Sequence, residues 1–459
     1  MPKQYDAIVI GTGQAGPALA GRMSAEGLRV AVVERHLVGG TCVNVGCIPT
    51  KTLVGSARVA YGAREAARFG VIVDAPVRVD MKRVKARKDE ITNASNQGVT
   101  SWLQGMQNVD LLHGHARLAG PTSVAVNEDV LEAPRIFINA GARARIPDWP
   151  GLADVAYLTN SSMMDLDILP EHLIVIGGSY IGLEFAQMYR RFGAEVTVIE
   201  MADRLIARED ADISEAVKSI LEGEGVRFRL NAECITVTPT RQGAAVGVSC
   251  DEEPRTVEGS HLLLAVGRVP NTDDLGLDEA GVRTDERGQI VVDEQLQTNV
   301  PGIWALGEIN GRGAFTHTAY NDYEIVAANL FDSHERSSND RIMCYGLFID
   351  PPLGRVGMTE AQARASGRKV LVGKRMMSRV GRAREFGETR GFMKFLVDAD
   401  TEALLGGAIL GLNGDEAVHG VLDVMYTGKP YTAIARAVHI HPTVAELIPT
   451  TLQDLRPLD

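Results

Sequence analysis

One unit of sequence occurs twice in this chain, and it restricts the possible folds more than any other feature. Each copy starts with an apolar segment (residues 6–10 and 173–176), continues into a glycine-rich loop, and then has a stretch suited to a helix. A second apolar segment follows and ends in an acidic residue, Glu34 in the first copy and Glu200 in the second. In both copies the acidic residue follows the last glycine of the loop by 18 positions. A strand, a glycine loop, a helix and a second strand with this ending form a dinucleotide-binding unit.

The chemistry expected of each unit is the same. Glycines let the backbone approach a pyrophosphate, the start of the helix offers unpaired N–H groups to it, and the acidic residue accepts hydrogen bonds from ribose hydroxyls. One glycine loop alone could reflect ordinary strand–helix packing, but two complete units with one spacing predict two dinucleotide sites. The residues expected there are Gly11, Gly13, Gly16 and Glu34 in the first unit, and Gly177, Gly178, Gly182 and Glu200 in the second.

Length and composition limit the number of domains, the possible partners and the expected location of the protein. The chain has 459 residues, which predicts roughly two to four domains. The net charge of −12 argues against non-specific nucleic-acid binding, and no apolar run reaches the length of about 18 residues that would cross a membrane. The first expected strand lies too near residue 1 to leave room for a signal peptide. Five cysteines are too few for a disulfide scaffold, so we expect a reducing, cytoplasmic location.

Proline–glycine punctuation divides the chain into regions. Such punctuation occurs at residues 140–151 and again at residues 267–271. The segment 298–308 is expected to be a short strand ending in an acidic residue. From about residue 341 onward, alternating segments such as 393–397 and 404–410 favour an α+β domain with an antiparallel sheet.

Two cysteines lie five positions apart, directly after the first unit. Cys42 and Cys47 belong to the run GGTCVNVGCIPTK at residues 39–51. Positions five apart on an ideal helix are separated by roughly 140° around its axis. A bridge between these cysteines therefore requires a distorted first helical turn, and Gly46 gives the backbone room for it. The alternative is two buried cysteines that never react.

Together these features resemble the class I pyridine nucleotide–disulfide oxidoreductases. This family includes glutathione reductase, dihydrolipoamide dehydrogenase and mercuric reductase, and the resemblance covers essentially the whole chain. It rests on the cysteine run, the two repeated units, and the motif His-Pro-Thr-x-x-Glu at residues 441–446. It implies an α/β fold with two Rossmann-like domains and an α+β dimerisation domain. The expected boundaries are 1–143 and 265–340 for an FAD-binding domain in two segments, 144–264 for an inserted NAD(P)-binding domain, and 341–459 for the dimerisation domain.

The resemblance also implies roles for individual residues. Cys42 and Cys47 would form a redox-active disulfide, with Cys47 nearer the flavin. His441, oriented by Glu446, would shuttle a proton at the disulfide of the partner subunit. Thiol–disulfide exchange needs a thiolate attacker and a protonated leaving thiol. Histidine can serve both needs because it titrates near neutral pH. Further residues expected at the FAD site are Gly40, Thr41, Lys51 paired with Glu184, His115, Ala116, Gly307 and Glu308; those expected at the NAD(P) site are Tyr180, as a gate over the nicotinamide, and Gly267.

Some of these assignments leave an alternative open. Tyr180 could serve simple packing, and His115 with Ala116 could belong to a plain strand. His439 is expected to be a surface residue, and no metal site is expected because His439 and His441 lack further ligands. The other cysteines, Cys234, Cys250 and Cys344, show no paired spacing and are expected to be structural.

The chain departs from the family pattern in several places. It ends without the cysteine pair that mercuric reductases and large thioredoxin reductases carry, and His441 stands where mercuric reductases usually have tyrosine. These departures weaken the interpretations as a mercuric reductase or a large thioredoxin reductase, and His441 instead favours a disulfide or related sulfur substrate. Ser179 replaces a glycine of the second loop, and Glu308 replaces the aspartate that binds the ribityl chain of FAD. A further departure begins at Asn139, at residues 139–141, and the sequence offers no reason for it.

The predicted function is therefore electron transfer from NAD(P)H through FAD and the Cys42–Cys47 disulfide to a small oxidised sulfur substrate. The expected assembly is a homodimer whose active sites are shared across the interface. Glu200 favours NAD(H) over NADP(H), because its carboxylate can bind a free 2′-hydroxyl and repels a 2′-phosphate. The alternatives are reduction of a metal ion such as Hg(II), direct quinone or diaphorase chemistry at the flavin, and a non-enzymatic partner subunit.

Overall fold

The computed structural model describes residues 1–249, 255–332 and 334–458, and in it the repeated units build two separate parallel sheets. The first sheet has the strand order β18-β8-β2-β3-β4. Its strands are β2 (Ala7–Ile10), β3 (Val30–Glu34), β4 (Val109–His113), β8 (Ile136–Ile138) and β18 (Ile303–Ala305). The strands β2, β3 and β8 are buried along their whole length, as expected for a parallel sheet covered on both faces. Because β18 pairs with β8, segments on both sides of the second unit share one sheet.

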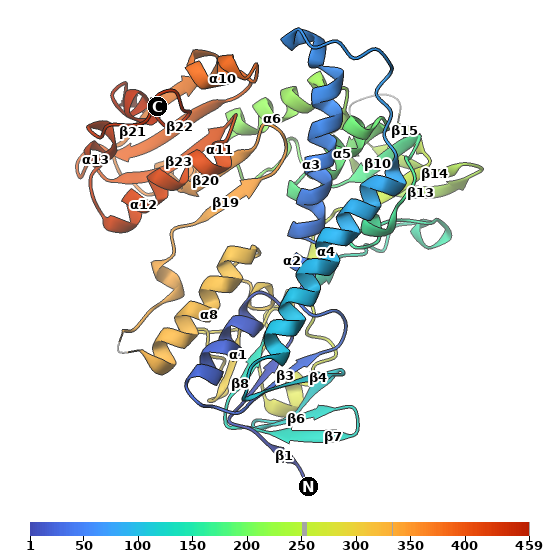
Figure 1. Cartoon of the computed structure of the whole chain (residues 1–459), viewed down its shortest axis with the longest axis vertical. Coiled ribbons are helices and arrows are strands. Elements are labelled where there is room, and N and C mark those ends of the chain that lie inside the picture. The colour runs from blue at the N-terminus through green and yellow to red at the C-terminus, as the bar shows by residue number, and fades with distance from the viewer. Residues whose placement is uncertain (250–254, 333, 459) are drawn as a thin grey trace.

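A smaller sheet completes this N-terminal lobe. It has the order β1-β7-β6-β5 and consists of β1 (Lys3–Gln4), β5 (Ala116–Gly120), β6 (Ser123–Val126) and β7 (Asp129–Glu132). The helices α1 (Ala15–Ala25) and α8 (Thr316–Phe331) pack against each other in the same lobe (Figure 1). The chain thus returns to its first sheet after the second unit is complete.

The second unit forms the sheet β12-β11-β10-β16, which is also parallel. Its strands are β10 (His172–Ile176), β11 (Glu195–Ile199), β12 (Arg227–Arg229) and β16 (His261–Leu264). An antiparallel sheet of β13 (Glu233–Thr240), β14 (Gly243–Ser249) and β15 (Thr256–Gly259) joins it, and β9 (Ala142–Ala144) pairs with β17 (Arg268–Pro270). The helices of this lobe are α5 (Tyr180–Phe192) and α6 (Ala211–Gly223).

The C-terminal lobe has the antiparallel sheet expected from its alternating segments. The order is β19-β20-β23-β22-β21-β24. Its strands are β19 (Cys344–Leu347), β20 (Leu353–Gly357), β21 (Val370–Met376), β22 (Phe392–Asp398), β23 (Leu404–Leu410) and β24 (Arg456–Pro457). Its helices are α9 (Glu360–Ala365), α10 (Gly381–Glu385), α11 (Gly414–Ala417), α12 (His419–Thr427), α13 (Thr432–Ala435) and α14 (Leu447–Leu452). The predicted α/β class with an α+β C-terminal part is confirmed.

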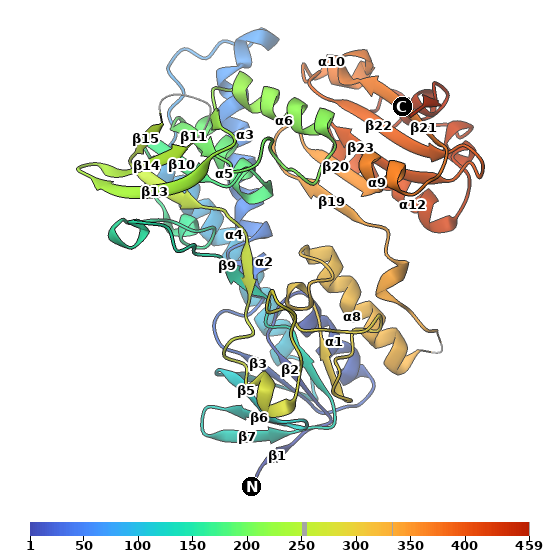
Figure 2. The same cartoon turned by 180° about the vertical axis from the view of Figure 1, so that it is seen from behind.

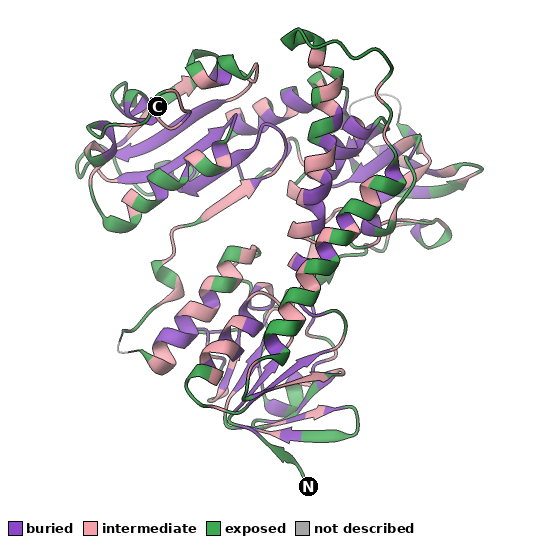
Figure 3. Cartoon of the chain, in the orientation of Figure 1, coloured by how far each residue is buried: buried purple, intermediate pink, exposed green. Residues whose placement is uncertain are grey.

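The long helices α3 (Cys47–Arg64) and α4 (Met81–Gln104) run between the lobes (Figures 1 and 2). Buried residues line the sheets, whereas the outward faces of α4 and α12 are exposed (Figure 3). The remaining short elements are α2 (Gly40–Asn44), α7 (Leu277–Ala280), η1 (Ala66–Phe69), η2 (Leu152–Asp154), η3 (Ser162–Asp165), η4 (Glu308–Asn310), η5 (Ser338–Asp340) and η6 (Met377–Arg379). No helix among the described residues is both long enough and apolar enough to cross a membrane.

One expected strand end is wrong. The segment 298–308 was expected to carry its strand up to the acidic residue, but β18 ends at Ala305. Gly307 has a φ of 80°, which turns the backbone out of the extended path and starts the η4 turn at Glu308. The acidic side chain therefore lies on a turn after the strand.

A buried cluster of charges joins the second-unit lobe to the C-terminal lobe. The ammonium group of Lys394, on β22, lies 2.9 Å from Asp210, 2.8 Å from Asp212 and 2.7 Å from Glu360. The Lys394 side chain is only 1% exposed. These three carboxylates are close enough together to ligate a cation, and the lysine supplies that cation. A buried charge of this kind is tolerated only when it is fully paired.

We predict that Lys394→Met lowers the free energy of unfolding by about 3 kcal/mol, because three carboxylates would lose their buried cation. The control is Lys374→Met on the neighbouring strand β21. Lys374 also contacts Asp212, at 2.6 Å, but its side chain is 39% exposed, so its loss should cost less than about 1 kcal/mol. Urea titration of both variants measures the difference, and equal losses would contradict the assignment.

Candidate functional site

The helical path breaks between the two cysteines of the run at residues 39–51. The helix α2 ends at Asn44, and α3 begins at Cys47. Between them Gly46 has φ −125° and ψ −117°, and a Cβ atom there would lie 2.7 Å from the carbonyl oxygen of Thr41. The break removes the angular separation that a continuous helix would impose on Cys42 and Cys47. Both cysteines are free thiols in this structure and are partly buried.

The two thiols differ in acidity. A hydrogen bond with Cys42 lowers the pKa of Cys47 to about 6; burial opposes this shift, whereas Thr316 and the charge of Lys51 support it. The same hydrogen bond raises the pKa of Cys42, and burial raises it further. At neutral pH the pair therefore holds one proton on Cys42 and one negative charge on Cys47. The Thr316 hydroxyl lies 3.0 Å from the Cys47 sulfur and must donate to it when Cys47 is a thiolate.

Lys51 lies one helical turn after Cys47, on the same side of α3. Its Nζ atom lies 2.6 Å from Oε2 of Glu184, a residue of α5 whose side chain is 5% exposed. The other oxygen of Glu184 accepts a hydrogen bond of 3.0 Å from the backbone N–H of Phe348. The Phe348 ring lies 4.6 Å from the same ammonium group. This ion pair thus connects the thiol helix, the second unit and the C-terminal lobe.

The first glycine loop forms a close-packed cradle beside the thiols. A Cβ atom on Gly11 would lie 2.4 Å from the Asn139 carbonyl oxygen, and one on Gly16 would lie 2.4 Å from the Gly11 carbonyl oxygen. Gly40 has a φ of 62°, and a Cβ atom there would lie 2.9 Å from Cα of Gly13. The start of α2, including the exposed Thr41, therefore rests on the loop. The arrangement fits a pyrophosphate at the start of α1.

Asn139 explains a departure that the sequence leaves without a reason. Its Oδ1 atom accepts a hydrogen bond of 3.1 Å from the Gly16 N–H, and its Nδ2 atom donates one of 2.8 Å to the Leu306 carbonyl. The side chain thus holds the glycine loop against the end of β18. An amide can do this because it carries a donor and an acceptor together.

Glu34 lies at the far end of the first cradle. Its carboxylate accepts hydrogen bonds from the backbone N–H of Thr12 at 3.0 Å, from the Thr12 hydroxyl at 2.5 Å and from the His36 N–H at 2.8 Å. His115, directly before Ala116 at the start of β5, lies 3.0 Å from the Asp274 carbonyl oxygen. Carboxylate oxygens have further lone pairs for ribose hydroxyls, so this end of the cradle fits the adenosine half of FAD.

Glu308 and Gly307 lie near the other end of the cradle. The carboxylate of Glu308 receives hydrogen bonds of 2.9 Å at both oxygens from Nε of Arg268. Glutamate has one methylene group more than aspartate, and the pairing with this arginine of β17 accommodates the longer side chain. Arg268 directly follows Gly267, which has a φ of 106°.

The second cradle repeats the first. Cβ atoms on Gly177 and Gly182 would lie 2.3 Å from the Ala265 carbonyl oxygen and 1.9 Å from the Gly177 carbonyl oxygen. Glu200 accepts hydrogen bonds from the N–H groups of Gly178 at 2.6 Å and Ala202 at 2.9 Å. Ser179 is exposed at the start of α5, so its hydroxyl leaves the backbone free to approach a pyrophosphate. The residues present fit a second dinucleotide.

Tyr180, the first residue of α5, lies in an aromatic cluster. Its ring meets Phe315 edge-on at a centroid distance of 5.9 Å and Tyr345 at 5.4 Å. Phe315 precedes Thr316, so the cluster adjoins the thiols. Sequence reasoning did not find Thr316, Tyr345 or Phe348. Tyr345 and Phe348 gave no signal, because only the tertiary fold brings this part of the C-terminal lobe to α5.

The histidine of the C-terminal motif stands apart from the thiols. Nδ1 of His441 lies 2.9 Å from Oε2 of Glu446, and the histidine side chain is 79% exposed. The helix α13, which precedes this segment, lies at the outer edge of the C-terminal lobe, on the far side from α2 and α3 (Figure 1). Within the part of the chain that is described, no hydrogen bond joins His441 to Cys42 or Cys47. Of the other cysteines, Cys344 is partly buried, and Cys250 lies outside the described residues.

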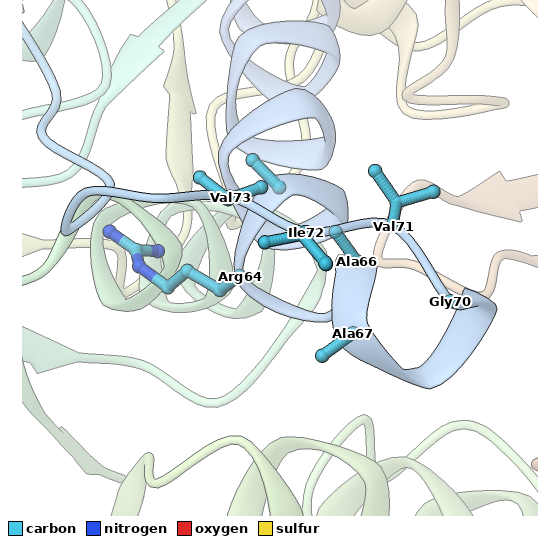
Figure 4. A pocket seen from close by; sticks show the side chains of 8 residues that line it. Arg64, Ala66, Ala67, Gly70, Val71, Ile72 and Val73 are labelled. Atoms are coloured by element: carbon cyan, nitrogen blue, oxygen red, sulfur yellow. The ribbon is translucent and has the colours of Figure 1, made fainter.

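A surface pocket of about 310 Å³ lies elsewhere, at the opposite end of α3 (Figure 4). Its lining includes Arg64, Ala67, Val71 and Val73. Cys47 and Arg64 are at opposite ends of α3, which separates them by about 25 Å. The pocket therefore has no part in the thiol chemistry.

Comparison with known proteins identifies relatives over almost the full length. Residues 5–322 match the family described as pyridine nucleotide-disulphide oxidoreductase, and residues 343–452 match the dimerisation domain of that family. RclA of Escherichia coli (strain K12), a probable pyridine nucleotide-disulfide oxidoreductase, is 37% identical over 96% of this chain and 97% of that protein. A mercuric reductase of Streptomyces lividans is 33% identical over 98% and 96%. A dihydrolipoyl dehydrogenase of Bacillus subtilis (strain 168) is 32% identical over 98% and 97%.

A solved structure shows the same arrangement. The HOCl-induced flavoprotein disulfide reductase RclA from Escherichia coli matches with a TM-score of 0.89 and 35% identity, over 98% of this chain and 100% of that chain. A Cu(II) complex of the same protein also matches with a TM-score of 0.89, over 99% of both chains.

We predict that Thr316→Val raises the pKa of Cys47 by about one unit above its value of about 6, because the thiolate loses one hydrogen-bond donor. A smaller fraction of Cys47 would then be ionised at pH 7. The pH dependence of Cys47 alkylation, followed by mass spectrometry, measures the shift. Thr316→Ser keeps the hydroxyl and serves as the control. A midpoint for the valine variant equal to that of the wild type would contradict the assigned hydrogen bond.

Proposed function

This chain belongs to the pyridine nucleotide-disulphide oxidoreductase family and is an FAD-dependent disulfide reductase, and we propose that it reduces a small oxidised sulfur compound directly at Cys42. The observation that carries the proposal is the Thr316 hydroxyl 3.0 Å from the Cys47 sulfur, together with a lowered pKa of Cys47 and a raised pKa of Cys42. Cys47 keeps its charge beside Lys51 and Thr316, whereas Cys42 keeps a proton that it can give up when it attacks.

The proposed mechanism assigns a step to each thiol. FAD, which the first glycine loop and Glu34 would hold, would supply hydride acceptance from a pyridine nucleotide and an electron pair for the Cys42–Cys47 disulfide. Cys42 then loses its proton and attacks one sulfur of the substrate disulfide; the substrate S–S bond breaks, and the departing thiolate takes that proton. The Cys47 thiolate next attacks the Cys42 sulfur. This releases the second substrate thiolate, which takes a proton from solvent, and re-forms the protein disulfide.

The proton on Cys42 needs a base, and we assign that role to His441 of a second copy of the chain. In a single chain the His441 side chain is 79% exposed. Its neighbours Val438 and Ile440 are 100% and 80% exposed. Apolar side chains so exposed favour a surface that a partner covers, and they fall within the region matched to the dimerisation domain. Glu446 would fix the orientation of the imidazole and stabilise its protonated form.

Two further assignments concern the domain bounds and the cellular compartment. We propose the division into residues 1–143 with 265–340, 144–264, and 341–459, because β18 joins the first sheet from beyond the second unit. A pair of working thiols among few cysteines favours a reducing, cytoplasmic compartment.

A second candidate function is reduction of a metal ion. Paired thiols, one of them ionised at neutral pH, suit soft metal ions. Mercuric reductases are among the relatives, and RclA has a solved Cu(II) complex. This function would require both cysteines without requiring His441. Quinone or diaphorase chemistry would require neither cysteine.

We predict that Cys42→Ser lowers turnover with a small disulfide about 10³-fold or more, because a serine hydroxyl cannot replace the attacking thiolate. The variant should still bind FAD and accept electrons from NADH. Stopped-flow mixing of the reduced enzyme with lipoamide, glutathione disulfide, hypothiocyanite, Hg(II) and quinones separates the candidate functions. Cys344→Ser changes another partly buried thiol and should have no effect. Disulfide turnover that persists in Cys42→Ser would refute the proposed role.

We propose NAD(H) as the preferred nucleotide, because the Glu200 carboxylate would bind a 2′-hydroxyl and repel a 2′-phosphate. Glu200→Gln removes the charge and keeps the size. We predict that it lowers kcat/KM for NADH about tenfold and raises kcat/KM for NADPH. Glu195→Gln, at the exposed start of the same strand, is the control and should change neither value. If Glu200→Gln leaves the NADH value unchanged, the assignment is wrong.

A further inference from the structure

Asn139 is the first residue after β8, the strand that lies between β2 and β18 in the first sheet. These three strands are parallel, so their carboxyl ends lie at the same edge of the sheet. The first glycine loop follows β2, and the turn at Gly307 and Glu308 follows β18. Neighbouring strands are about 4.8 Å apart. The loop and the turn are therefore two strand spacings apart, with Asn139 between them.

The side chain of Asn139 bonds to the loop on one side and to the turn on the other. Its Oδ1 atom accepts a hydrogen bond from the Gly16 N–H, and its Nδ2 atom donates one to the Leu306 carbonyl. The residue is only 6% exposed, so water does not compete for these bonds. Within the described part of the chain, no hydrogen bond joins residues 11–16 directly to residues 306–310. The Asn139 amide is thus their direct hydrogen-bonded link.

The amide has one orientation and little room to move. The Gly16 N–H can only donate and the Leu306 carbonyl can only accept, which fixes the places of the oxygen and the nitrogen. A Cβ atom on Gly13 would lie 2.7 Å from Oδ1, and one on Gly307 would lie 3.0 Å from Nδ2. The side chain therefore packs against a glycine on each side.

The turn after β18 is itself held in place. Asp322, on α8, accepts hydrogen bonds from the Gly307 N–H at 2.6 Å and from Nδ2 of Asn310 at 3.0 Å. The Asp322 side chain is 2% exposed and forms an ion pair with Arg341. A buried carboxylate with this set of partners is costly to move. The turn is thus rigid, and the bonds of Asn139 hold it at one spacing from the loop.

We propose that Asn139 is a positioning residue for FAD, which it serves by fixing the spacing between the glycine loop and the turn at Gly307 and Glu308. The inference rests on the proposed function, in which the loop holds the pyrophosphate of FAD and the turn holds its ribityl chain. FAD contacts both parts at once, whereas ADP has no ribityl chain and can reach only the loop. A loosened spacing lowers the fraction of molecules that are ready for FAD, and so raises its apparent dissociation constant.

The test uses Asn139→Leu, which keeps the branched shape of the side chain and removes both hydrogen bonds. Calorimetric titration of the full-length chain, freed of FAD, measures binding of FAD and of ADP. We expect the dissociation constant to rise about tenfold for FAD and less than about threefold for ADP. Asn139→Ala removes the same two bonds without adding methyl groups, and should give the same pair of results if leucine does not fit.

The holoenzyme provides a second readout. Release of FAD after dilution, followed by the fluorescence of free FAD, should be about tenfold faster in both variants. The control is Asn329→Ala, at the opposite end of α8 from Thr316. The Asn329 amide donates a hydrogen bond of 2.8 Å to the Arg336 carbonyl and accepts one of 2.8 Å from the Arg336 N–H. It loses the same kinds of bond as Asn139→Ala and should release FAD as the wild type does.

The outcomes distinguish this inference from the proposed function. Equal weakening of FAD and ADP would show that Asn139 acts on the glycine loop alone, and unchanged FAD binding would show that the spacing does not depend on it; either result refutes the inference. Both results leave the reduction at Cys42 standing, because Cys42→Ser tests that step in an enzyme that retains FAD. If Cys42→Ser refutes that step, the FAD and ADP constants of the Asn139 variants still decide the role of Asn139.

Discussion

The ion pair between Lys51 and Glu184 fixes the geometry on which the rest of the site depends. Glu184 is nearly buried, so removing Lys51 would leave an uncompensated carboxylate in the interior. The pair sets the position of α3, and hence of Cys47, relative to the helix that begins at the second glycine loop. Because Glu184 also binds the Phe348 N–H, the C-terminal lobe is held in the same arrangement. The thiol helix α3 thus packs against α5, the helix that begins at the second glycine loop.

The unequal thiols follow from that arrangement. Lys51 supplies a positive charge and Thr316 a hydroxyl on the side of Cys47, whereas Cys42 has the Cys47 sulfur as its acceptor. Two identical side chains thus acquire different protonation states from their surroundings alone. In the proposed mechanism this difference sets the direction of thiol exchange, and a second chain supplies the base for the Cys42 proton. The exposed His441–Glu446 pair is the group with the right chemistry to supply it.

The sequence predicted local features well and distant contacts poorly. The glycine loops, Glu34 and Glu200 could be found because a dinucleotide cradle needs fixed residue types at fixed spacing. The alternation at residues 404–410 predicted β23 with the bounds that it has. The strand end at Glu308 was wrong because one glycine conformation redirects the backbone. Asn139 stood out in the sequence without a reason, since its partners lie on other strands, and Tyr345 gave no signal because its partners come from three different segments.

The central claim is that the thiol pair of one chain works with His441 of another, and mixed dimers test it most directly. Neither the Cys42→Ser homodimer nor the His441→Gln homodimer contains a complete site. A heterodimer of the two variants contains one complete site, made from the cysteines of one chain and the histidine of the other. If subunits exchange at random in an equal mixture, about one quarter of the wild-type sites should be restored. The account predicts disulfide reductase activity near that level; activity no greater than the mean of the two homodimers would contradict it.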